Sequence, residues 1–297
     1  MRALVTGGRG FVGTHLERHL RECGDEVVAV DIEHDVADVS DMTKVISDVQ
    51  PDVIYHLAAI SHVGKSWDDP SDVLRVNVLG TAAVLAAARQ LKHPTTTLLI
   101  SSAEVYGIVT PSDLPLSELS PVRPASPYAA SKLAAEVVAQ QAVRGYHQRV
   151  VVARPFNHIG PGQSPTFFVP ALATRLVGAQ RSGANSVPVG NLTTRRDFTD
   201  VRDVVRAYRL LVERGVSGEI YNVASGTDRS MQEIAELLRD HVDPRLTFDV
   251  DPSLLRPADV PILRGDADKL KAATNWSPLI DFEVTLGDIL DAVQRTS

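Results

Sequence analysis

The sequence predicts an α/β protein built on a doubly wound parallel sheet. Short apolar runs alternate with segments rich in helix-forming residues from residue 2 to about residue 154, with short connections between them. A glycine-rich turn follows the first apolar run. Repeated strand–helix–strand units of this kind form parallel sheets, which bind ligands at the carboxyl ends of their strands. With 297 residues, of which 44% are hydrophobic, the chain is long enough for one large domain or one and a half.

The first predicted strand and helix form a dinucleotide-binding turn. An apolar run over residues 2–6 leads into a turn rich in glycine, and leucines at helical spacing follow it. Gly7 permits the tight turn, Gly10 lets backbone N–H groups approach a pyrophosphate at the helix N-terminus, and Gly13 allows close packing of helix on strand. The arrangement favours a Rossmann-type fold whose candidate cofactor contacts here are Gly7, Gly10, Phe11, Val12 and Gly13.

The end of the next strand indicates which dinucleotide is bound. The apolar run over residues 26–31 ends in Asp31. A carboxylate there accepts hydrogen bonds from a ribose 2′-hydroxyl and repels a 2′-phosphate. NAD is therefore favoured, with NADP as the alternative cofactor. A solvated loop carboxylate is the alternative interpretation of Asp31.

Two later segments complete the predicted cofactor site. Asp38 and Val39 precede a helix over about residues 42–49, where they would flank the adenine. The strand over residues 53–59 ends in small residues, which leave room for a flat cofactor. His56 in this strand is predicted to be structural rather than catalytic. The candidate contacts at the strand end are Leu57, Ala58 and Ala59.

The alternation continues with a long helix over about residues 71–91, a strand over 97–100 and a strand over 149–154. Residues 101–107 follow the first of these strands, and Asn157 follows the second. Both segments should therefore lie at the carboxyl edge of the sheet, where ligands bind.

Tyr128 and Lys132 are the candidate catalytic pair. They open a run of good helix formers, and residues four apart lie on one face of a helix, so a phenol and an ammonium should share one pocket. A nearby ammonium favours the phenolate and should lower the phenol pKa from its usual value of about 10. Such a pair moves a proton to or from a sugar or alcohol oxygen.

The second half of the chain reads as a loop-rich substrate lobe. Prolines interrupt the pattern after residue 155, and the helices there are expected to be shorter. Residues 230–233 form a capping box that opens a helix, residues 246–250 a short strand, and residues 282–293 a C-terminal helix. The apolar strand over residues 219–223 should return to the main sheet. We therefore expect a cofactor domain over residues 1–160 with a returning segment near 190–225, and a smaller, partly interleaved substrate lobe over residues 161–297.

Composition excludes several classes of partner. The net charge of −7 gives no footprint for nucleic acid. The single cysteine, Cys23, excludes an intrachain disulfide framework and a thiolate metal cluster, so no metal is predicted. We expect no signal sequence and no apolar run approaching the length of a membrane span, which fits a cytoplasmic protein without a membrane partner.

With these motifs in place, the chain resembles the extended short-chain dehydrogenase/reductases that modify nucleotide sugars, over nearly its whole length. The motifs that stand in the family's order and spacing are the glycine turn, His56-Leu-Ala-Ala59, Asn77 in Val76-Asn-Val-Leu-Gly80, Ser102 before Val105-Tyr-Gly107, and Tyr128 with Lys132. The resemblance implies that Tyr128 is the acid/base, that Lys132 is its electrostatic partner and a ribose ligand, and that Ser102 donates a hydrogen bond to the reacting oxygen. It also implies that Asn77 and Pro155 contact the cofactor.

Within this family the chain is similar to the GDP-mannose branch, which contains 4,6-dehydratases and GDP-4-keto-6-deoxy-mannose reductases. The segments that carry the likeness are residues 61–66, 154–163, 190–203 and 256–261. The resemblance implies that Arg196 and Arg256 grip the pyrophosphate of a nucleotide sugar, with Asp200 and Asp259 ordering neighbouring arginines. It also implies further substrate contacts from Ser61, His62, Asn157 and Val169.

The reaction is left open among related chemistries. A reductase needs only hydride and a proton from Tyr128, whereas a dehydratase also needs a base and an acid at C5 and C6. Here Ser102 replaces the Thr of dehydratases and Ala103 is inert, but Glu104 keeps dehydration open. The compact length and the Pro-Gly-Gln sequence within residues 154–163 resemble the reductases and favour reduction. Epimerisation is a further alternative, and a non-catalytic NAD-binding regulator is a distant one. A homodimer through the helix near 72–91 and the helix after Tyr128 is expected.

Overall fold

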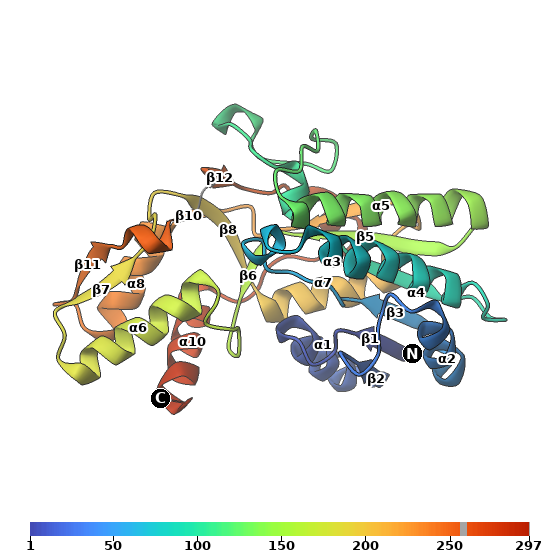
Figure 1. Ribbon diagram of the computed structural model, residues 1–297, viewed down its shortest axis with the longest axis horizontal. Coiled ribbons are helices and arrows are strands. Elements are labelled where there is room, and N and C mark those ends of the chain that lie inside the picture. Colours follow the sequence, from blue (N-terminus) through green and yellow to red (C-terminus); the bar gives the residue numbers. More distant parts are fainter. Residues whose placement is uncertain (256–259, 297) are drawn as a thin grey trace.

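The computed structural model describes residues 1–255 and 260–296, and its largest feature is a six-stranded parallel sheet (Figure 1). In spatial order the strands are β2 (Glu26–Val30), β1 (Arg2–Thr6), β3 (Val53–His56), β4 (Thr96–Ile100), β5 (Arg149–Pro155) and β9 (Ile220–Val223). Every pair of neighbours is parallel. The predicted doubly wound sheet is confirmed, and so is the return of the strand near residue 220.

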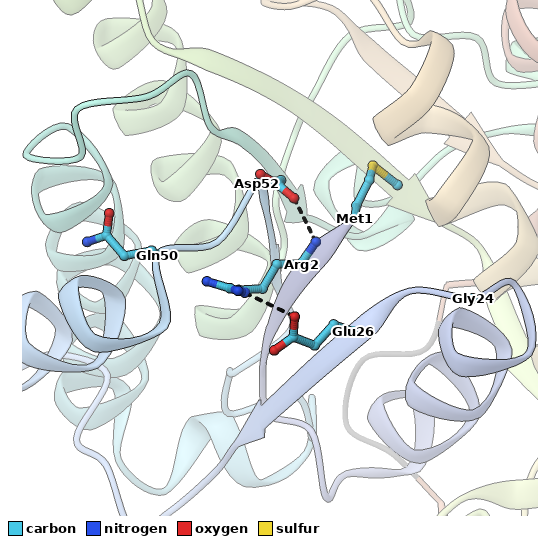
Figure 2. Close-up of a pocket in the computed structure, with 6 residues that line it drawn as sticks. All are labelled: Met1, Arg2, Gly24, Glu26, Gln50 and Asp52. Carbon is cyan, nitrogen blue, oxygen red and sulfur yellow. Dashed lines mark hydrogen bonds and ion pairs between the residues drawn. The ribbon is translucent and has the colours of Figure 1, made fainter.

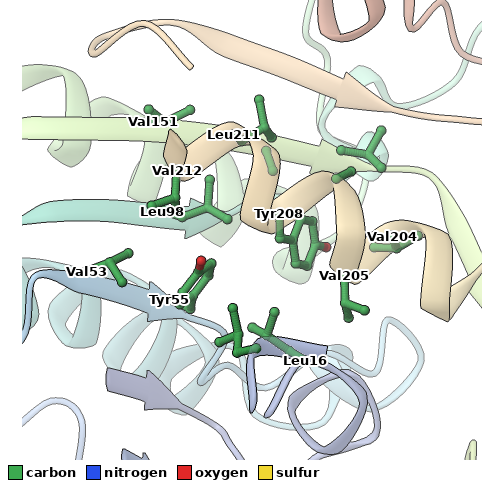
Figure 3. Packing of buried hydrophobic residues seen from close by; sticks show 14 of the residues in the cluster. Leu16, Val53, Tyr55, Leu98, Val151, Val204, Val205, Tyr208, Leu211 and Val212 are labelled. Carbon is green, nitrogen blue, oxygen red and sulfur yellow. The ribbon is translucent and has the colours of Figure 1, made fainter. Parts of the chain in front are cut away.

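Helices cover both faces of this sheet because alternate strand residues point to opposite sides. One face packs on α1 (Phe11–Glu22), α7 (Val201–Arg214) and α9 (Asp268–Thr274). In that core Tyr208 and Leu211 of α7 point toward Leu98 and Val151 of the sheet (Figure 3). The other face packs on α2 (Val39–Val49), α4 (Gly80–Ala88) and α5 (Pro127–Tyr146). Both faces are thus closed to water, and ligands must enter at an edge.

The strand order creates the opening for a ligand. After β1 the chain passes through α1 to β2 on one side, and after β2 it crosses through α2 to β3 on the other side of β1. The ends of β1 and β3 are paired up to Thr6 and His56, but the chain leaves them toward opposite faces of the sheet. This is a topological switch point, where doubly wound sheets bind their ligands. The glycine turn and residues 57–59 lie at these two ends.

The long helix predicted over residues 71–91 is a composite. It runs through α3 (Pro70–Leu74), a π-helical turn η2 (Arg75–Leu79) and α4, and Asn77 lies buried inside the π turn. A π turn inserts one extra residue and reorients the side chains around it, a feature that often marks functional sites. Periodicity alone did not reveal this turn.

The same stretch corrects one expectation. Residues Pro70–Ala88 have a mean hydropathy of 1.3 and satisfy the length and composition of a membrane span, so the statement that no apolar run approaches that length was wrong. Half of this stretch is buried inside the protein, where it packs on α2 and α5. Core helices of folded proteins meet the same criteria.

The second lobe packs a separate core. Its helices α6 (Phe168–Ser182), α8 (Met231–Val242) and α10 (Phe282–Thr296) gather with β7 (Ser186–Val189) and β11 (Thr247–Val250) at one end of the molecule (Figure 1). A further sheet holds β8 (Arg195–Asp200) between β10 (Asp228–Ser230) and β12 (Ile262–Leu263), and β6 (Asn157–Ile159) also pairs with β8. The predicted capping box at residues 230–233 is confirmed.

The expectation of shorter helices in this half was wrong. α6 has 15 residues and α7 has 14, and neither was predicted from the sequence. α6 begins shortly after Pro165 and carries Pro170 in its first turn, where a proline costs little because that N–H group has no helical partner. Proline there starts a helix rather than interrupting one.

The two lobes interleave along the chain. α7, β9 and α9 come from the second half of the sequence, yet they pack on the first sheet, and Trp276 is fully buried in its core. The division of roles at about residue 160 stays a prediction.

A turn at the carboxyl edge is held by Gly107, and it yields a test of the fold. Gly107 ends the short helix η3 (Ala103–Tyr106) with φ +69°, and a methyl group on its Cα would overlap the carbonyl oxygen of Arg123. We expect Gly107→Ala to lower the free energy of unfolding by about 1 to 3 kcal/mol, because a strained backbone and a clash coincide. The difference in the free energy of unfolding is measured by urea unfolding of the variant and the wild type, fitted with one shared m-value.

Gly178→Ala is the matched control. Gly178 lies on the exposed side of α6, and nothing lies within 4 Å of its added Cβ. Alanine favours the helix there, so this variant should gain roughly 0.5 to 1 kcal/mol. Equal stability of the Gly107 variant and the wild type would contradict the assignment.

Candidate active site

The catalytic candidates lie in the first two turns of α5. Ser126 caps this helix, because its hydroxyl accepts a hydrogen bond from Ala129 N at 3.1 Å, and Pro127 follows at the first helical position. Tyr128 and Lys132 are both buried, and the ammonium lies 5.9 Å from the centre of the phenol ring. The structure thus brings the two side chains together on one face.

Burial shifts the pKa of both groups, each toward its neutral form. Burial raises the pKa of Tyr128 to about 12, against a lowering contribution from the hydrogen bond with Ser102. Burial lowers the pKa of Lys132 to about 8, against the raising effect of Glu136. The expectation that Lys132 lowers the pKa of Tyr128 is wrong for the protein alone, since desolvation dominates. Its Nζ instead donates to the carbonyl oxygen of Ile100 at 2.9 Å.

Ser102 links the end of β4 to the phenol. Its hydroxyl accepts a hydrogen bond from Glu104 N at 3.2 Å, which caps η3, and it is hydrogen-bonded to the Tyr128 side chain. The Glu104 charge also reaches Tyr128 and raises its pKa. All four predicted catalytic residues therefore meet at the carboxyl ends of β4 and the start of α5.

The glycine turn fits a dinucleotide pyrophosphate. Gly10 is the N-cap of α1, and because glycine has no side chain, no side-chain cap accepts hydrogen bonds from the first backbone N–H groups of this helix. These N–H groups point toward the crevice. A methyl group on Gly13 would overlap the Gly7 carbonyl oxygen, and one on Gly7 would approach Ala58 N at 2.8 Å. The turn, the helix and the end of β3 thus pack tightly and leave a helix N-terminus that favours an anion. Phe11 and Val12 are the first two residues of α1.

The adenosine candidates lie after β2 and before α2. The carboxylate of Asp31 accepts hydrogen bonds from Arg9 N at 2.7 Å and from Ile32 N at 2.9 Å. The Arg9 guanidinium is paired with Glu33 at 2.8 Å. Arg9 was not predicted to belong to the site, although its place inside the glycine turn could have indicated it.

Asp38 has a second role that sequence reasoning missed. It caps α2, because its Oδ1 accepts hydrogen bonds from Ser40 N at 2.8 Å and Asp41 N at 3.2 Å. The neighbouring Val39 is about half exposed. The adenine-flanking position proposed for these two residues is therefore open to a ligand and rigidly held.

Asn77 joins the loop after β3 to α5 through its side-chain amide, and its contact with the cofactor stays a prediction. Its Oδ1 accepts from Ile60 N at 2.8 Å, and its Nδ2 donates to Ile60 O at 3.1 Å and to Ser131 Oγ at 2.8 Å. The π turn thereby ties the loop after β3, with Leu57, Ala58 and Ala59 at its start, to α5. Pro155 is the buried last residue of β5.

The segment predicted to flank the hexose is anchored on the catalytic helix. Ser66 Oγ donates to Val63 O at 2.6 Å and accepts a hydrogen bond from Tyr128 N at 3.3 Å. His62 lies 5.9 Å, centre to centre, from the ring of Phe167 just before α6, and Ser61 is exposed beside it. Residues 61–66 therefore lie between Tyr128 and the second lobe.

The remaining substrate candidates are divided between the lobes. Asn157 opens β6 and is half-buried, and Arg196 on β8 is nearly buried, with its Nη1 donating to Arg195 O at 2.8 Å. Val169 is buried in the core of the second lobe, so its side chain contacts protein. Asp200 caps α7 and pairs with Arg202 at 2.7 Å instead of Arg196. Arg256 and Asp259 lie outside the described residues.

Two cavities lie apart from these groups. One, of about 460 Å³, opens at the amino ends of β1 and β2, where Arg2 pairs with Glu26 and its backbone N–H donates to Asp52 (Figure 2). That edge is opposite to the glycine turn. The other, of about 420 Å³, lies beside the end of β9. Within residues 1–255 and 260–296, no group of three or more His, Cys, Asp or Glu side chains could hold a metal ion.

Comparison with known proteins agrees with this geometry. The family model of GDP-mannose 4,6 dehydratase matches residues 31–289. The GDP-6-deoxy-D-mannose reductase of Pseudomonas aeruginosa is 38% identical, with 97% of this chain and 96% of that protein covered.

Solved structures show the same fold. The structure of RMD from Pseudomonas aeruginosa complexed with NADPH superposes with a TM-score of 0.92 at 35% identity, over 100% of both chains. The Thermus thermophilus UDP-glucose 4-epimerase complex with NAD has a TM-score of 0.89 at 27% identity, again over 100% of both chains. A glycine turn at the switch point, a Tyr–Lys pair on α5 and a match over most of the sequence therefore lead to one conclusion: the chain belongs to the GDP-mannose 4,6-dehydratase family, within the extended short-chain dehydrogenase/reductases.

Proposed function

We propose that this protein reduces the C4 ketone of a GDP-4-keto-6-deoxy-hexose with a nicotinamide cofactor. The observation that carries the proposal is the Tyr128 hydroxyl, which is hydrogen-bonded to Ser102 and buried next to Lys132 at the carboxyl edge of the sheet. The similarity to a GDP-6-deoxy-D-mannose reductase over nearly the whole chain supports the same reaction. Residues 1–160 would mainly hold the cofactor, and residues 161–297 the nucleotide sugar.

The cofactor would lie across the switch point, with its pyrophosphate at the N-terminus of α1 and its adenosine between Asp31 and Asp38. When bound, the nicotinamide supplies the hydride. The chain's own part is to hold the ketone against Ser102 and Tyr128 and to provide the proton.

Tyr128 is suited to donate that proton. A pKa of about 12 keeps the phenol protonated at neutral pH, so it is ready to protonate the oxygen that becomes the C4 hydroxyl. Lys132, charged below a pKa of about 8, stabilises the phenolate left behind. Ser102 donates a hydrogen bond to the same oxygen and orients the ketone.

Dehydration of GDP-mannose is the second candidate, because the Glu104 charge reaches the catalytic phenol. A carboxylate near Tyr128 would serve as a base toward the sugar ring. A single carboxylate would then have to remove the C5 proton and also assist loss of the C6 hydroxyl.

The two reactions give different assays. We expect the purified protein to oxidise NADH when GDP-4-keto-6-deoxy-mannose is supplied and to leave GDP-mannose unchanged. The absorbance of NADH follows the reduction, and chromatography of the sugar nucleotides follows any conversion of GDP-mannose. Formation of a 4-keto-6-deoxy product from GDP-mannose alone would overturn the reductase proposal in favour of dehydration.

Tyr128→Phe is the control for this assay. It removes the proton donor, so turnover should fall by roughly 100-fold or more, while NADH binding stays within a few-fold of the wild type. Binding without turnover in the wild type as well would favour the non-catalytic regulator.

We further propose that NADH is preferred to NADPH. Asp31, at the end of β2, lies where a ribose 2′-phosphate would be placed, and it would repel that group. We expect Asp31→Ser to raise the affinity for NADPH relative to NADH by about tenfold, the factor given by ~1.4 kcal/mol of relieved repulsion. Binding of each cofactor is measured by fluorescence titration.

Asp48→Asn is the matched control for Asp31. It removes one acidic charge from the same lobe, in an exposed pair with Lys44 on α2, and should leave the ratio of affinities unchanged. A wild type that binds NADPH more tightly than NADH would refute the preference.

We also propose that the protein works in the cytoplasm as a homodimer joined through α4 and α5. These helices are neighbours, and they leave apolar side chains outside: Leu79 is 56% exposed at the start of α4 and Val137 is 62% exposed on α5. Partly exposed Ala82, Ala86, Ala134 and Val138 flank them. Such a two-helix face can pair with its own copy about a two-fold axis.

The proposed dimer is tested by placing negative charges at the centre of the predicted interface. Leu79→Asp combined with Val137→Asp should yield a monomer in sedimentation velocity, because four carboxylates would be buried in the interface. Val284→Asp, on an exposed apolar position of α10, is the control and should leave the dimer intact. A wild type that sediments as a monomer would refute the proposal.

A further inference from the structure

A buried ion pair lies directly behind the catalytic pair. Glu136 on α5 and Arg154 on β5 have side chains that are each 4% exposed. Arg154 Nε donates to Glu136 Oε1 at 2.8 Å, and its Nη2 donates to Oε2 at 2.7 Å. This bidentate geometry fixes both side chains and compensates the cost of burying them.

The same carboxylate also holds the strand end that carries Ser102. Ser101 Oγ donates to Glu136 Oε1 at 2.5 Å. The residue before it, Ile100, accepts from Lys132 Nζ, and the residue after it, Ser102, is hydrogen-bonded to Tyr128. Three consecutive residues of β4 and its exit are thus each joined to a different side chain of α5.

The network continues toward the second lobe. Arg154 Nη1 donates to the Tyr106 hydroxyl at 3.1 Å, which donates to Asn222 Oδ1 on β9 at 2.7 Å. The Asn222 amide in turn donates to Leu116 O and Asp266 O. Glu136 therefore lies between the catalytic helix and a chain of buried hydrogen bonds that spans the sheet.

We propose that Glu136 is a positioning residue for the reaction, which holds Ser102 in register with Tyr128 and keeps Lys132 in its charged form. This proposal rests on one part of the function proposed above, namely that Ser102, Tyr128 and Lys132 take part in turnover. Glu136 itself is turned to Arg154 and Ser101, so it acts through its neighbours.

The charges around Lys132 make this role specific. The charge of Glu136 acts on Lys132 along α5, and Lys132 in turn acts on His56 of β3. Glu104 acts on the neighbouring Tyr128, and Arg154 of β5 is paired with Glu136. His56 is neutral, because burial lowers its pKa to about 3. Glu136, one turn away, is the carboxylate whose charge raises the pKa of Lys132. Its loss would remove that negative charge and leave the buried Arg154 guanidinium without its partner.

Glu136→Gln tests the proposal without a change of shape. The chain has six lysines, so the Lys132 ammonium can be followed by ¹⁵N NMR of lysine side chains and assigned with Lys132→Met. We expect the titration midpoint of Lys132 in the ligand-free protein to move down by about one pH unit in the variant, because it loses a nearby opposite charge. The alkaline limb of turnover, where substrate is reduced, should move down with it.

Two further variants separate charge from structure. Glu136→Gln with Arg154→Met removes both charges. Because Glu136 is the charge that raises the pKa of Lys132 and the single variant leaves the Arg154 cation unpaired, the midpoint of the double variant should lie between those of the wild type and the single variant. This double variant also decides the matter if the single variant does not fold. Ser101→Ala breaks one hydrogen bond without a charge change and should leave the midpoint in place.

An unchanged Lys132 midpoint in a folded Glu136→Gln or double variant would overturn the charge role, and turnover equal to wild type at every pH would overturn the positioning role. A shifted midpoint together with slower turnover supports both. The NMR titration needs no substrate, so failure of the wild type to reduce GDP-4-keto-6-deoxy-mannose would sink the proposed reaction and leave the Lys132 measurement intact.

Discussion

The contact between the end of β4 and α5 is the constraint on which the site depends. Ile100, Ser101 and Ser102 are bonded in turn to Lys132, Glu136 and Tyr128. Buried polar groups tolerate little displacement, because each lost partner leaves an uncompensated dipole or charge in a medium of low dielectric constant. The parallel sheet fixes the strand end, the strand end fixes the helix, and the helix presents the phenol to the crevice beside the glycine turn.

That arrangement sets the state of the acid before any ligand binds. Burial favours the neutral phenol and weakens the charge on Lys132, so the protein alone holds a proton donor rather than a phenolate. A bound dinucleotide would bring ribose hydroxyls to the ammonium, which in the structure donates to the carbonyl oxygen of Ile100. The pair is therefore suited to give a proton to a ketone when cofactor and sugar are both in place.

Hydrophobic periodicity and glycine spacing predicted much of the fold, but they predicted the candidate site only in part. The strands, the glycine turn and the returning strand near residue 220 are local patterns. The π turn at Asn77 has no such local pattern, because one inserted residue leaves the helical period of the sequence almost unchanged. Glu136 reads in sequence as an ordinary helix residue, and only the packing of α5 on β5 shows that it is buried with Arg154. The direction of the Tyr128 pKa shift was missed because sequence shows a neighbouring charge but not desolvation.

The same geometry bears on the choice between reduction and dehydration. Reduction needs one proton donor at C4, which Tyr128 supplies, whereas dehydration needs two more proton transfers at C5 and C6. The segment after β4 offers Ser102, the inert Ala103 and the single carboxylate of Glu104, so both transfers would fall to one group. That group would have to reach two adjacent carbons from a short helix whose first turn is fixed by the Ser102 cap and whose end is fixed by Gly107. A rigid turn with one carboxylate therefore fits the simpler reaction better.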